Sequence, residues 1–194
     1  MVGKSADSWE AAYSRALNSG NTEEAQRLID LRWNNDAPNT KYNGDLYHNT
    51  TERFTAFDPE FMGKTDAGYY GHGFYFTPNK TDINNALGPI QKHVYVNLEN
   101  PRNLTASDYV SGELLGNDGA IVRNGEEGWL NLDGAPAPDP NEVMEVVVNK
   151  PENIKSVAPV TYDNNGWTIP ITERFHFNPQ DVDIRGRGWF GEPI

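Results

Sequence analysis

The run Gly71-His72-Gly73-Phe74-Tyr75-Phe76-Thr77 decides the fold class, because a glycine-rich entry leads directly into an aromatic strand. Aromatic residues favour strands, and successive side chains of a strand point to opposite faces of its sheet. Phe74 and Phe76 therefore share one face, and Tyr75 lies on the other. The run predicts a short strand that contributes aromatic side chains to a core.

Other β-rich runs occur on both sides of this strand, separated by Gly, Pro, Asn and Asp, which are typical of turns. They are Leu46–His48, His93–Leu98, Ala120–Arg123, Val143–Val148 and Ile154–Val160. We expect a short helix over 82–87, and a long exposed loop over 125–141, which is rich in proline and acidic residues. The pattern predicts a mixed α+β domain dominated by sheet, with the end of the chain, 167–194, wrapped over its surface.

The N-terminal part of the chain has the apolar periodicity of amphipathic helices. The first apolar stripe, with spacing i, i+3, i+4, i+7 and i+8, consists of Trp9, Ala12, Tyr13, Ala16 and Leu17. Asp7 and Glu10 form a capping box at the start of this helix, and Ser19-Gly20 end it.

A second helix is predicted to begin at Asn21, with Glu24 three residues later, and to end before Pro38. Its apolar stripe consists of Ala25, Leu28, Ile29 and Trp33. Two helices joined by a glycine turn predict a helical hairpin, residues 1–40, which packs its stripes on a second unit, residues 41–194.

Composition limits the chemistry that the chain can use. The 194 residues suffice for one domain with a small helical appendage. The absence of cysteine excludes disulfides and thiolate catalysis. A formal net charge of −12, from 16 Lys and Arg against 28 Asp and Glu, opposes loose association with nucleic acid or anionic lipid.

No apolar stretch approaches the roughly 20 residues of a membrane span. Residues 1–8 also lack the apolar core of a signal peptide. We therefore expect a soluble, monomeric protein without a membrane partner. It would be cytoplasmic unless it is secreted or injected as an effector.

Three separated segments carry residues suited to chemistry. They are Tyr47-His48-Asn49-Thr50, the Gly71–Thr77 run with Tyr75, and Glu145 at the start of the apolar run Val146–Val148. Taken singly, each has an ordinary structural interpretation: a core histidine, a core aromatic residue and a solvated carboxylate at a strand end. His72 and His93 lack the spacing of metal ligands, and we expect no metal site.

Taken together, the three segments resemble the His-Tyr-Glu constellation of ADP-ribosyltransferases of the diphtheria-toxin and poly-ADP-ribose polymerase type. The stretch from Glu145 through Lys150-Pro151 to Ile154-Lys155-Ser156 resembles the ADP-ribosyltransferase domains of bacterial and phage polyvalent proteins. The resemblance extends over about 11–185. It implies a split antiparallel sheet preceded by a helical hairpin, with NAD bound as substrate.

The resemblance also implies roles for individual residues. His48 would bind a ribose of NAD, and the main chain of Asn49, supported by the hydroxyl of Thr50, would hold the nicotinamide amide. Gly73 would let the backbone approach the ligand, and Tyr75 would stack on the nicotinamide ring. Asn49 stands where the family usually has glycine.

Glu145 is the predicted catalytic carboxylate. It would stabilise the cation that forms when NAD is cleaved and act as base toward the acceptor. A second stacking tyrosine, present in many poly-ADP-ribose polymerases, is not evident in 82–87. Either the nicotinamide pocket is half open, or Tyr69 or Tyr70 closes it. No metal is required.

The segment before Glu145 is expected to bind the acceptor. Trp129 is the predicted anchor for a protein partner, the alternative being that its ring folds back onto the domain. Glu142, three residues before Glu145, would face away from it on an ideal strand, which argues against an arginine acceptor. The predicted reaction is transfer of ADP-ribose to a protein side chain; the alternatives are an NAD glycohydrolase and a non-catalytic NAD- or ADP-ribose-binding module.

Overall fold

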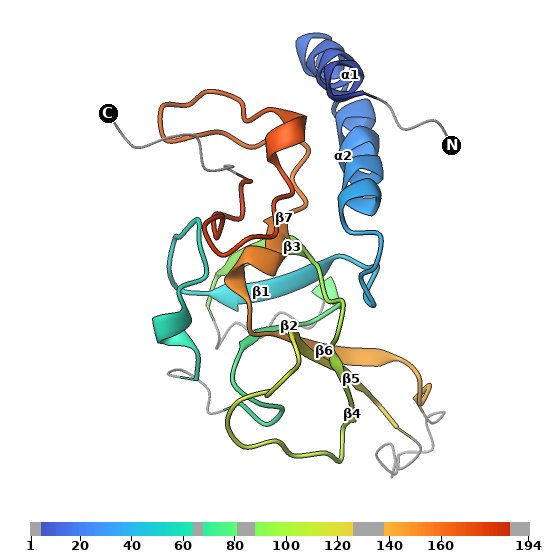
Figure 1. Cartoon of the computed structure of the whole chain (residues 1–194), viewed down its shortest axis with the longest axis vertical. Coiled ribbons are helices and arrows are strands. Elements are labelled where there is room, and N and C mark those ends of the chain that lie inside the picture. Colours follow the sequence, from blue (N-terminus) through green and yellow to red (C-terminus); the bar gives the residue numbers. More distant parts are fainter. Residues whose placement is uncertain (1–4, 64–67, 81–87, 126–137, 187–194) are drawn as a thin grey trace.

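The computed structural model describes residues 5–63, 68–80, 88–125 and 138–186. Among these residues, two helices precede seven strands and three short 3₁₀ helices, and Figure 1 shows how they are arranged. In chain order the elements are α1 (Ala6–Asn18), α2 (Thr22–Asp36), β1 (Leu46–Thr50), η1 (Pro59–Phe61), β2 (Phe74–Phe76), β3 (Ile90–Val96), β4 (Arg102–Thr105), β5 (Gly119–Arg123), β6 (Val143–Val148), η4 (Pro151–Asn153), β7 (Ile154–Ser156) and η5 (Ile171–Glu173).

The strands form two sheets. One has the order β1-β3-β7, and the other has the order β2-β6-β5-β4. All neighbours are antiparallel except β4 and β5, which are parallel. An isolated bridge between Tyr47 and Thr77 links the sheets. The α+β class with mostly antiparallel sheets is therefore confirmed.

The predicted helical hairpin is present, and one of its two predicted caps is correct. The Asn21 side chain accepts a hydrogen bond from the Glu24 amide at 3.0 Å, as expected of an N-cap. The predicted capping box at Asp7 is wrong, because the N-cap of α1 is Ser5 and Asp7 lies inside the first turn. Glu10 instead accepts hydrogen bonds from the main chain and hydroxyl of Thr172, at 2.7 and 2.6 Å.

The apolar stripes of both helices are buried against β3 and the C-terminal segment. Trp33 stacks on Tyr95 of β3 with 4.8 Å between ring centroids, and it meets the ring of Phe175 edge-on at 5.6 Å. Val157 and Ile171 complete this helix-side core. The hairpin thus packs its stripes on the rest of the chain, as its apolar periodicity predicts.

Two further cores lie on the two faces of β6. The Phe76 core lies between the two sheets. The sheet of β2, β6 and β5 contributes Phe74, Phe76, Val146, Val148 and Ile121. The other sheet contributes Leu46, Val94, Val96 and Ile154. The Val147 core covers the opposite face and consists of Leu104, Val110, Leu114, Ala120, Val122 and Val147. The alternation of Phe74, Tyr75 and Phe76 across β2 is therefore as expected, since Tyr75 packs on the Val147 core.

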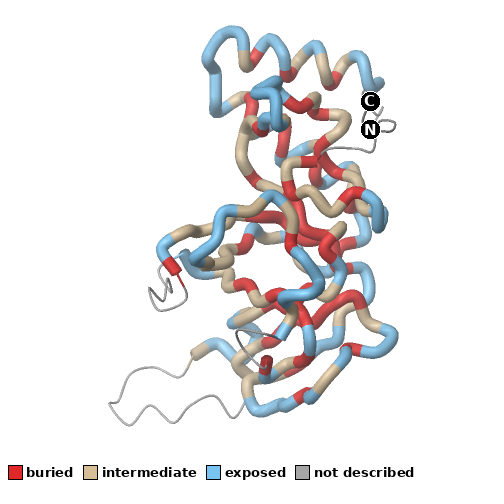
Figure 2. Tube along the Cα trace, turned by 90° about the vertical axis from the view of Figure 1, so that its left-hand side faces the viewer, coloured by how far each residue is buried: buried red, intermediate tan, exposed pale blue. Residues whose placement is uncertain are grey.

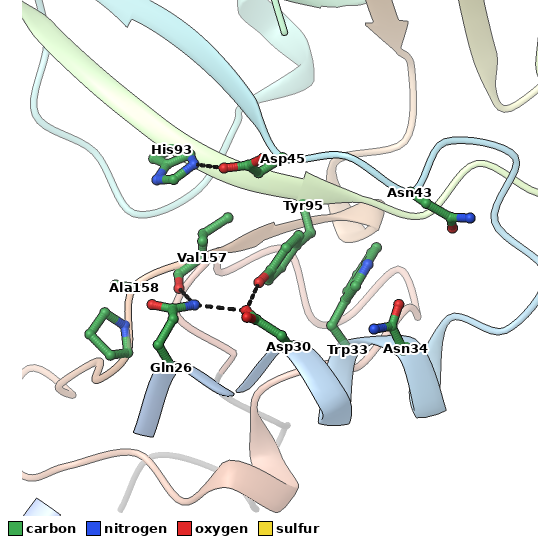
Figure 3. Close-up of a pocket in the computed structure, with 11 residues that line it drawn as sticks. Gln26, Asp30, Trp33, Asn34, Asn43, Asp45, His93, Tyr95, Val157 and Ala158 are labelled. Atoms are coloured by element: carbon green, nitrogen blue, oxygen red, sulfur yellow. Dashed lines mark hydrogen bonds and ion pairs between the residues drawn. The ribbon is translucent and has the colours of Figure 1, made fainter. Parts of the chain in front are cut away.

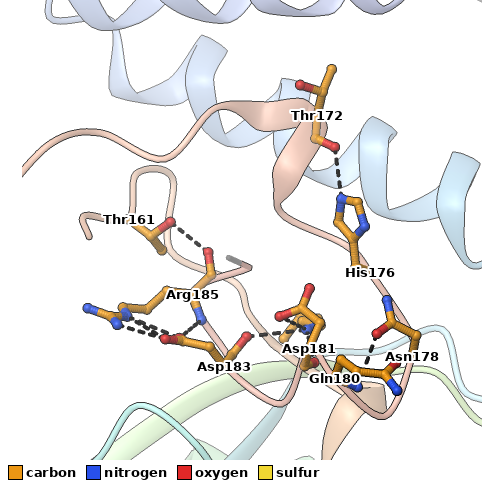
Figure 4. Close-up of polar contacts among 9 residues, drawn as sticks. Thr161, Thr172, His176, Asn178, Gln180, Asp181, Asp183 and Arg185 are labelled. Atoms are coloured by element: carbon orange, nitrogen blue, oxygen red, sulfur yellow. Dashed lines mark hydrogen bonds and ion pairs between the residues drawn. The ribbon is translucent and has the colours of Figure 1, made fainter. Parts of the chain in front are cut away.

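The segment after β7 is partly at the surface, as the sequence suggested, with Trp167 74% exposed, but it also contributes apolar side chains to the interior. Ile169, Ile171, Phe175 and Ile184 are all buried (Figure 2). Short polar contacts fix its last turns: Asp183 accepts from Arg185, and the Thr161 hydroxyl donates to the Arg185 carbonyl at 2.9 Å (Figure 4). The four apolar side chains are buried because they close the cores at the β7 end.

The predicted helix over 82–87 lies outside the described residues, and so do Trp129 and most of the predicted acceptor loop. Within the described ranges, neither helix has the length and apolar character needed to traverse a membrane.

Candidate functional site

Strand β1 pairs very differently along its two edges. Toward β3 all five of its residues are paired, from Leu46 opposite Val94 to Thr50 opposite Ile90. Toward β2 there is a single bridge, in which Tyr47 and Thr77 exchange two main-chain hydrogen bonds of 2.9 Å. The sheets therefore split immediately after Tyr47.

The main chain of Asn49 faces this split. In an antiparallel strand, alternate residues direct their N–H and C=O to the same side, so those of Asn49 point the same way as those of Tyr47. In the part of the chain that the structure describes, no β2 residue hydrogen-bonds to them. Asn49 thus offers a donor and an acceptor side by side.

The His48 side chain occupies the position where the ladder would continue. After the Tyr47–Thr77 bridge, an unbroken antiparallel ladder would pair Asn49 with Tyr75. Instead, the Tyr75 carbonyl accepts a hydrogen bond of 2.8 Å from His48 Nδ1. The His48 side chain thus takes the place of the Asn49 amide as partner of the Tyr75 carbonyl, and the main-chain ladder ends here.

The same bond fixes the tautomer of His48. A carbonyl can only accept, so Nδ1 carries the proton and Nε2 keeps its lone pair. Burial beside Phe57 and Phe76, with ring centroids at 5.1 and 5.4 Å, lowers the pKa of His48. His48 is therefore a neutral ring whose Nε2 is an acceptor, and no other hydrogen bond of this ring occurs among the described residues.

Tyr75 and Glu145 lie on the same face of the second sheet. Tyr75 is directly opposite Val147, and Glu145 is two residues before Val147 on β6. Residues two apart on a strand share a face, so Tyr75, Val147 and Glu145 follow one another on the Val147-core side. Glu145 is half-buried there.

Tyr70 joins this group. Its pKa is raised, mainly by burial and next by the negative charge of Glu145, which places its ring near that carboxylate. Its hydroxyl donates to the Ala106 carbonyl at 3.3 Å, whereas Tyr69 is 68% exposed. Of the two tyrosines considered from the sequence, Tyr70 is the one held beside Tyr75 and Glu145.

The hydroxyl of Tyr75 organises the loop before β2. It donates to the Gly71 carbonyl at 2.7 Å and accepts from the Tyr70 amide at 3.1 Å. Gly68, with φ +67°, lies so close that a Cβ there would be 2.4 Å from this hydroxyl oxygen. Tyr75 therefore has a structural role in addition to any contact with a ligand.

Gly73 approaches β6. A Cβ at this position would lie 2.5 Å from Val147 Cγ1 and 2.9 Å from the Val148 carbonyl oxygen. Packing of β2 on β6 therefore requires glycine here, and this explains the second glycine of the motif without a ligand.

The side chain of Asn49 is held by a β3 residue, and that of Thr50 by the chain directly after β1. Asn49 Oδ1 accepts from Gln91 Nε2 at 3.3 Å, and Thr50 Oγ1 accepts from the Glu52 amide at 3.1 Å. Asn49 therefore presents main-chain groups to the split, while its amide side chain is bound by β3.

The prediction for Glu142 assumed an ideal strand, which the structure does not have. The β5–β6 ladder is irregular between Val122, which pairs with Glu145, and Arg123, which pairs with Val143. Glu142 precedes β6, is exposed, and accepts from Asn124 Nδ2 at 3.2 Å. Simple alternation therefore does not fix the direction of Glu142 relative to Glu145.

The ring of His48 and the carboxylate of Glu145 belong to opposite faces. His48 contacts the Phe76 core, whereas Glu145 lies on the Val147-core side. In a continuous sheet these groups would be separated by the sheet itself.

Sequence reasoning missed Lys92, which pairs with His48 across β1 and β3. Its Nζ donates to the Phe54 carbonyl at 2.6 Å and lies 4.6 Å from the Phe54 ring centre. Its positive charge adds to the effect of burial in keeping His48 neutral. No local sequence signal marks Lys92, because its proximity to His48 arises from strand register.

No cluster of three or more His, Cys, Asp or Glu side chains suited to a metal ion occurs in 5–63, 68–80, 88–125 or 138–186. A cavity of about 510 Å³ exists elsewhere, between α2 and β3, and is lined by none of His48, Tyr75 and Glu145. Neither the models of known protein families nor the curated protein sequences give a match to the chain.

Proposed function

We propose that this protein is an ADP-ribosyltransferase that transfers ADP-ribose from NAD to a macromolecule, a protein side chain, and releases nicotinamide. The observation that carries the proposal is the open main chain of Asn49 at the split, beside Tyr75 and His48. The resemblance to the diphtheria-toxin and poly-ADP-ribose polymerase type assigns nicotinamide binding to this position. The division of the strands into two mostly antiparallel sheets supports it further.

The nicotinamide amide carries one carbonyl acceptor and one N–H₂ donor. The N–H and C=O of Asn49 form the complementary pair, and two such bonds fix the ring in one orientation. Tyr70 and Tyr75 supply aromatic rings on the Val147-core side of β2. A flat ring suits the planar, cationic nicotinamide of NAD.

His48 suits a ribose hydroxyl. Because its Nδ1 is bound to the Tyr75 carbonyl, its Nε2 accepts but does not donate. A ribose hydroxyl can donate to that atom. The low pKa of His48 keeps this acceptor available at neutral pH.

Glu145 carries the chemistry. The bond between C1′ of ribose and the nicotinamide nitrogen breaks, and nicotinamide leaves as a neutral molecule with the bonding electrons. The ribose gains oxocarbenium character, which the carboxylate of Glu145 stabilises. The acceptor then forms the new bond to C1′, and its proton passes to Glu145.

The experiment that tests the proposal compares the wild type with Glu145→Gln in the presence of NAD labelled on its adenosine part, alone and with cell lysate. Free nicotinamide and label on macromolecules are both followed. We expect label on a discrete protein with the wild type only. Nicotinamide release without label would indicate a glycohydrolase, and NAD binding without either signal would indicate a binding module.

A further inference from the structure

A second candidate site is the cavity of about 510 Å³ between α2, β3 and the segment after β7 (Figure 3). Its volume is within the usual range of roughly 300–1,000 Å³ for small-ligand sites. The described residues that line it are Gln26, Asp30, Trp33, Asn34, Asn43, Asp45, His93, Tyr95, Val157, Ala158 and Pro159.

The floor of the cavity is aromatic and rigid. Trp33 and Tyr95 are stacked at 4.8 Å with an angle of 11° between their rings, and Val157 lies with them in the helix-side core. Such a surface suits the aliphatic part of an amphipathic side chain. Nε1 of Trp33 is a buried donor without a hydrogen-bond partner in the described part of the chain.

The rim is acidic, and its carboxylates retain open acceptor positions. Oδ1 of Asp30 accepts from Gln26 Nε2 at 2.8 Å and from the Tyr95 hydroxyl, and Oδ2 of Asp45 is bound to His93. The other oxygen of each carboxylate has no hydrogen-bond partner among the described residues. Both aspartates are exposed.

The remaining polar groups of the rim include both hydrogen-bond donors and acceptors. The side chains of Asn34 and Asn43 are exposed at the rim and make no hydrogen bond with any described residue. His93 is the sole basic side chain among the described lining residues, and it is already bound to Asp45. The cavity therefore has negative charge that no lysine or arginine of its lining offsets.

We propose that this cavity binds a guanidinium or ammonium group carried on an aliphatic stem. The stem would lie on Trp33 and Tyr95, and the cationic head would donate to Asp30 and Asp45. An anion would be repelled by the same carboxylates. A net charge of −12 for the whole chain favours the approach of a basic partner.

Two sources can supply this chemistry, a basic side chain of a protein and a free organic cation. A peptide and a free cation that carry the same head group distinguish the two sources. The site is independent of the proposed transfer reaction, since the cavity shares no residue with the group formed by His48, Tyr75 and Glu145.

The test is calorimetric titration of the whole protein with three probes: a blocked arginine tripeptide, the same peptide with citrulline, and agmatine. We expect the arginine peptide to bind and the citrulline peptide, which lacks the charge, not to bind. Agmatine as tight as the peptide would assign the site to a free cation, and a tighter peptide would assign it to a protein segment. Absence of millimolar binding by both cations would overturn the proposal.

Variants locate the binding. Asp30→Asn with Asp45→Asn is expected to weaken binding at least about tenfold, because two charge-assisted contacts are lost. The matched control is Glu23→Gln with Glu113→Gln, which changes the net charge equally at exposed residues outside the cavity. An equal loss in the control would mean diffuse attraction and would overturn the proposal.

A second variant keeps both carboxylates and reduces the volume of the cavity. Ala158→Phe would fill the cavity while leaving both aspartates in place, and a thermal melt checks that the fold survives. We expect it to abolish binding of the arginine peptide. Binding that persists in a folded Ala158→Phe protein would place the ligand elsewhere and overturn the proposal.

Discussion

The region around Lys155 and the split beside His48 hold their ionisable groups in opposite ways. Lys155 and Asp181 have fully buried side chains, with 3.3 Å between Nζ and Oδ1. Nζ also donates to the main-chain carbonyls of Asp181 at 2.8 Å and Asp183 at 3.2 Å. Burial lowers the pKa of Lys155 and raises that of Asp181, because the charged form of each side chain loses its hydration in the interior.

At the split, the corresponding groups are only partly enclosed. His48 and Glu145 are half-buried, and the Asn49 main chain has no partner on β2 within the described ranges. A group surrounded by protein partners contributes to the fold and has no capacity left for a ligand. A donor or acceptor left open at the end of a ladder retains that capacity, so substitutions in the two regions should have different consequences.

The largest expected effect is that of Glu145→Gln on turnover. The change keeps the shape of the side chain but removes the charge that would stabilise the ribose cation, so nicotinamide release should fall by roughly 10²–10⁴. NAD affinity should stay within a few-fold, and thermal stability should be unchanged. Glu23→Gln is the control, because Glu23 is exposed in the first turn of α2 and belongs to none of the three segments. Unchanged turnover in Glu145→Gln would remove Glu145 from the mechanism.

Lys155→Met should instead lower the stability of the fold. It leaves the Asp181 carboxylate buried without its cation, which typically costs about 3–5 kcal/mol of unfolding free energy. Urea unfolding followed by circular dichroism measures the loss. Adding Asp181→Asn should restore part of the stability, since the unpaired charge is then absent. A loss in Lys155→Met below about 1 kcal/mol would show that Asp181 is solvated or protonated in the native protein.

Tyr75→Ala should affect both ligand binding and stability, because Tyr75 lies beside the split and also anchors the loop before β2. Loss of ring stacking should weaken NAD binding by roughly 1–2 kcal/mol. Tyr75→Phe is the matched variant: it keeps the ring and removes the hydroxyl bonds to Gly71 and Tyr70. We expect it to bind NAD normally and to lose about 1 kcal/mol of stability. Normal NAD binding by Tyr75→Ala would leave Tyr75 with its structural role alone.

Asn49→Pro tests the open edge directly. Proline removes the N–H that faces the split, while Thr50 on the β3 side keeps its pairing with Ile90. One lost hydrogen bond of about 0.5–1.5 kcal/mol should weaken NAD binding about tenfold. Asn49→Gly retains the N–H and should bind NAD as well as the wild type. Equal affinity in the Pro and Gly variants would place nicotinamide away from Asn49.

The sequence predicted the elements whose signals are local. The apolar spacing from Trp9 to Leu17 and the cap at Asn21 depend on residues within one or two turns of each other, and both are confirmed. β4 was missed because Arg102–Thr105 has one buried apolar residue and pairs in parallel with a distant strand. Its strand character comes from tertiary pairing, which composition does not encode.

The candidate site was predictable in its residues but not in its geometry. His48, Tyr75 and Glu145 are recognisable from their neighbours in the chain. The bond from His48 to the Tyr75 carbonyl and the irregularity after Val122 depend on the register of strand pairing. A shift of one residue in that register would move every side chain of the strand to the opposite face of its sheet. The open main chain of Asn49 has no sequence signal, because it follows from where β1 and β2 separate.

The smallest expected effect is on pH dependence. Because its pKa is lowered in the folded protein, His48 binds its proton less readily there than in the unfolded chain, whose pKa is about 6.5. Its contribution to stability is therefore complete above that pH and is lost as the pH falls through the folded pKa. Nε2 should likewise accept a ribose hydroxyl at neutral pH and lose that capacity only in acid.

NAD titrations across this range should show a flat affinity down to about pH 6.5 and weakening below it, whereas His48→Gln, which does not titrate, should show no such fall. A fall already centred at the ordinary histidine pKa would mean that the ring is solvated, and that the split is wider than the bond to Tyr75 implies.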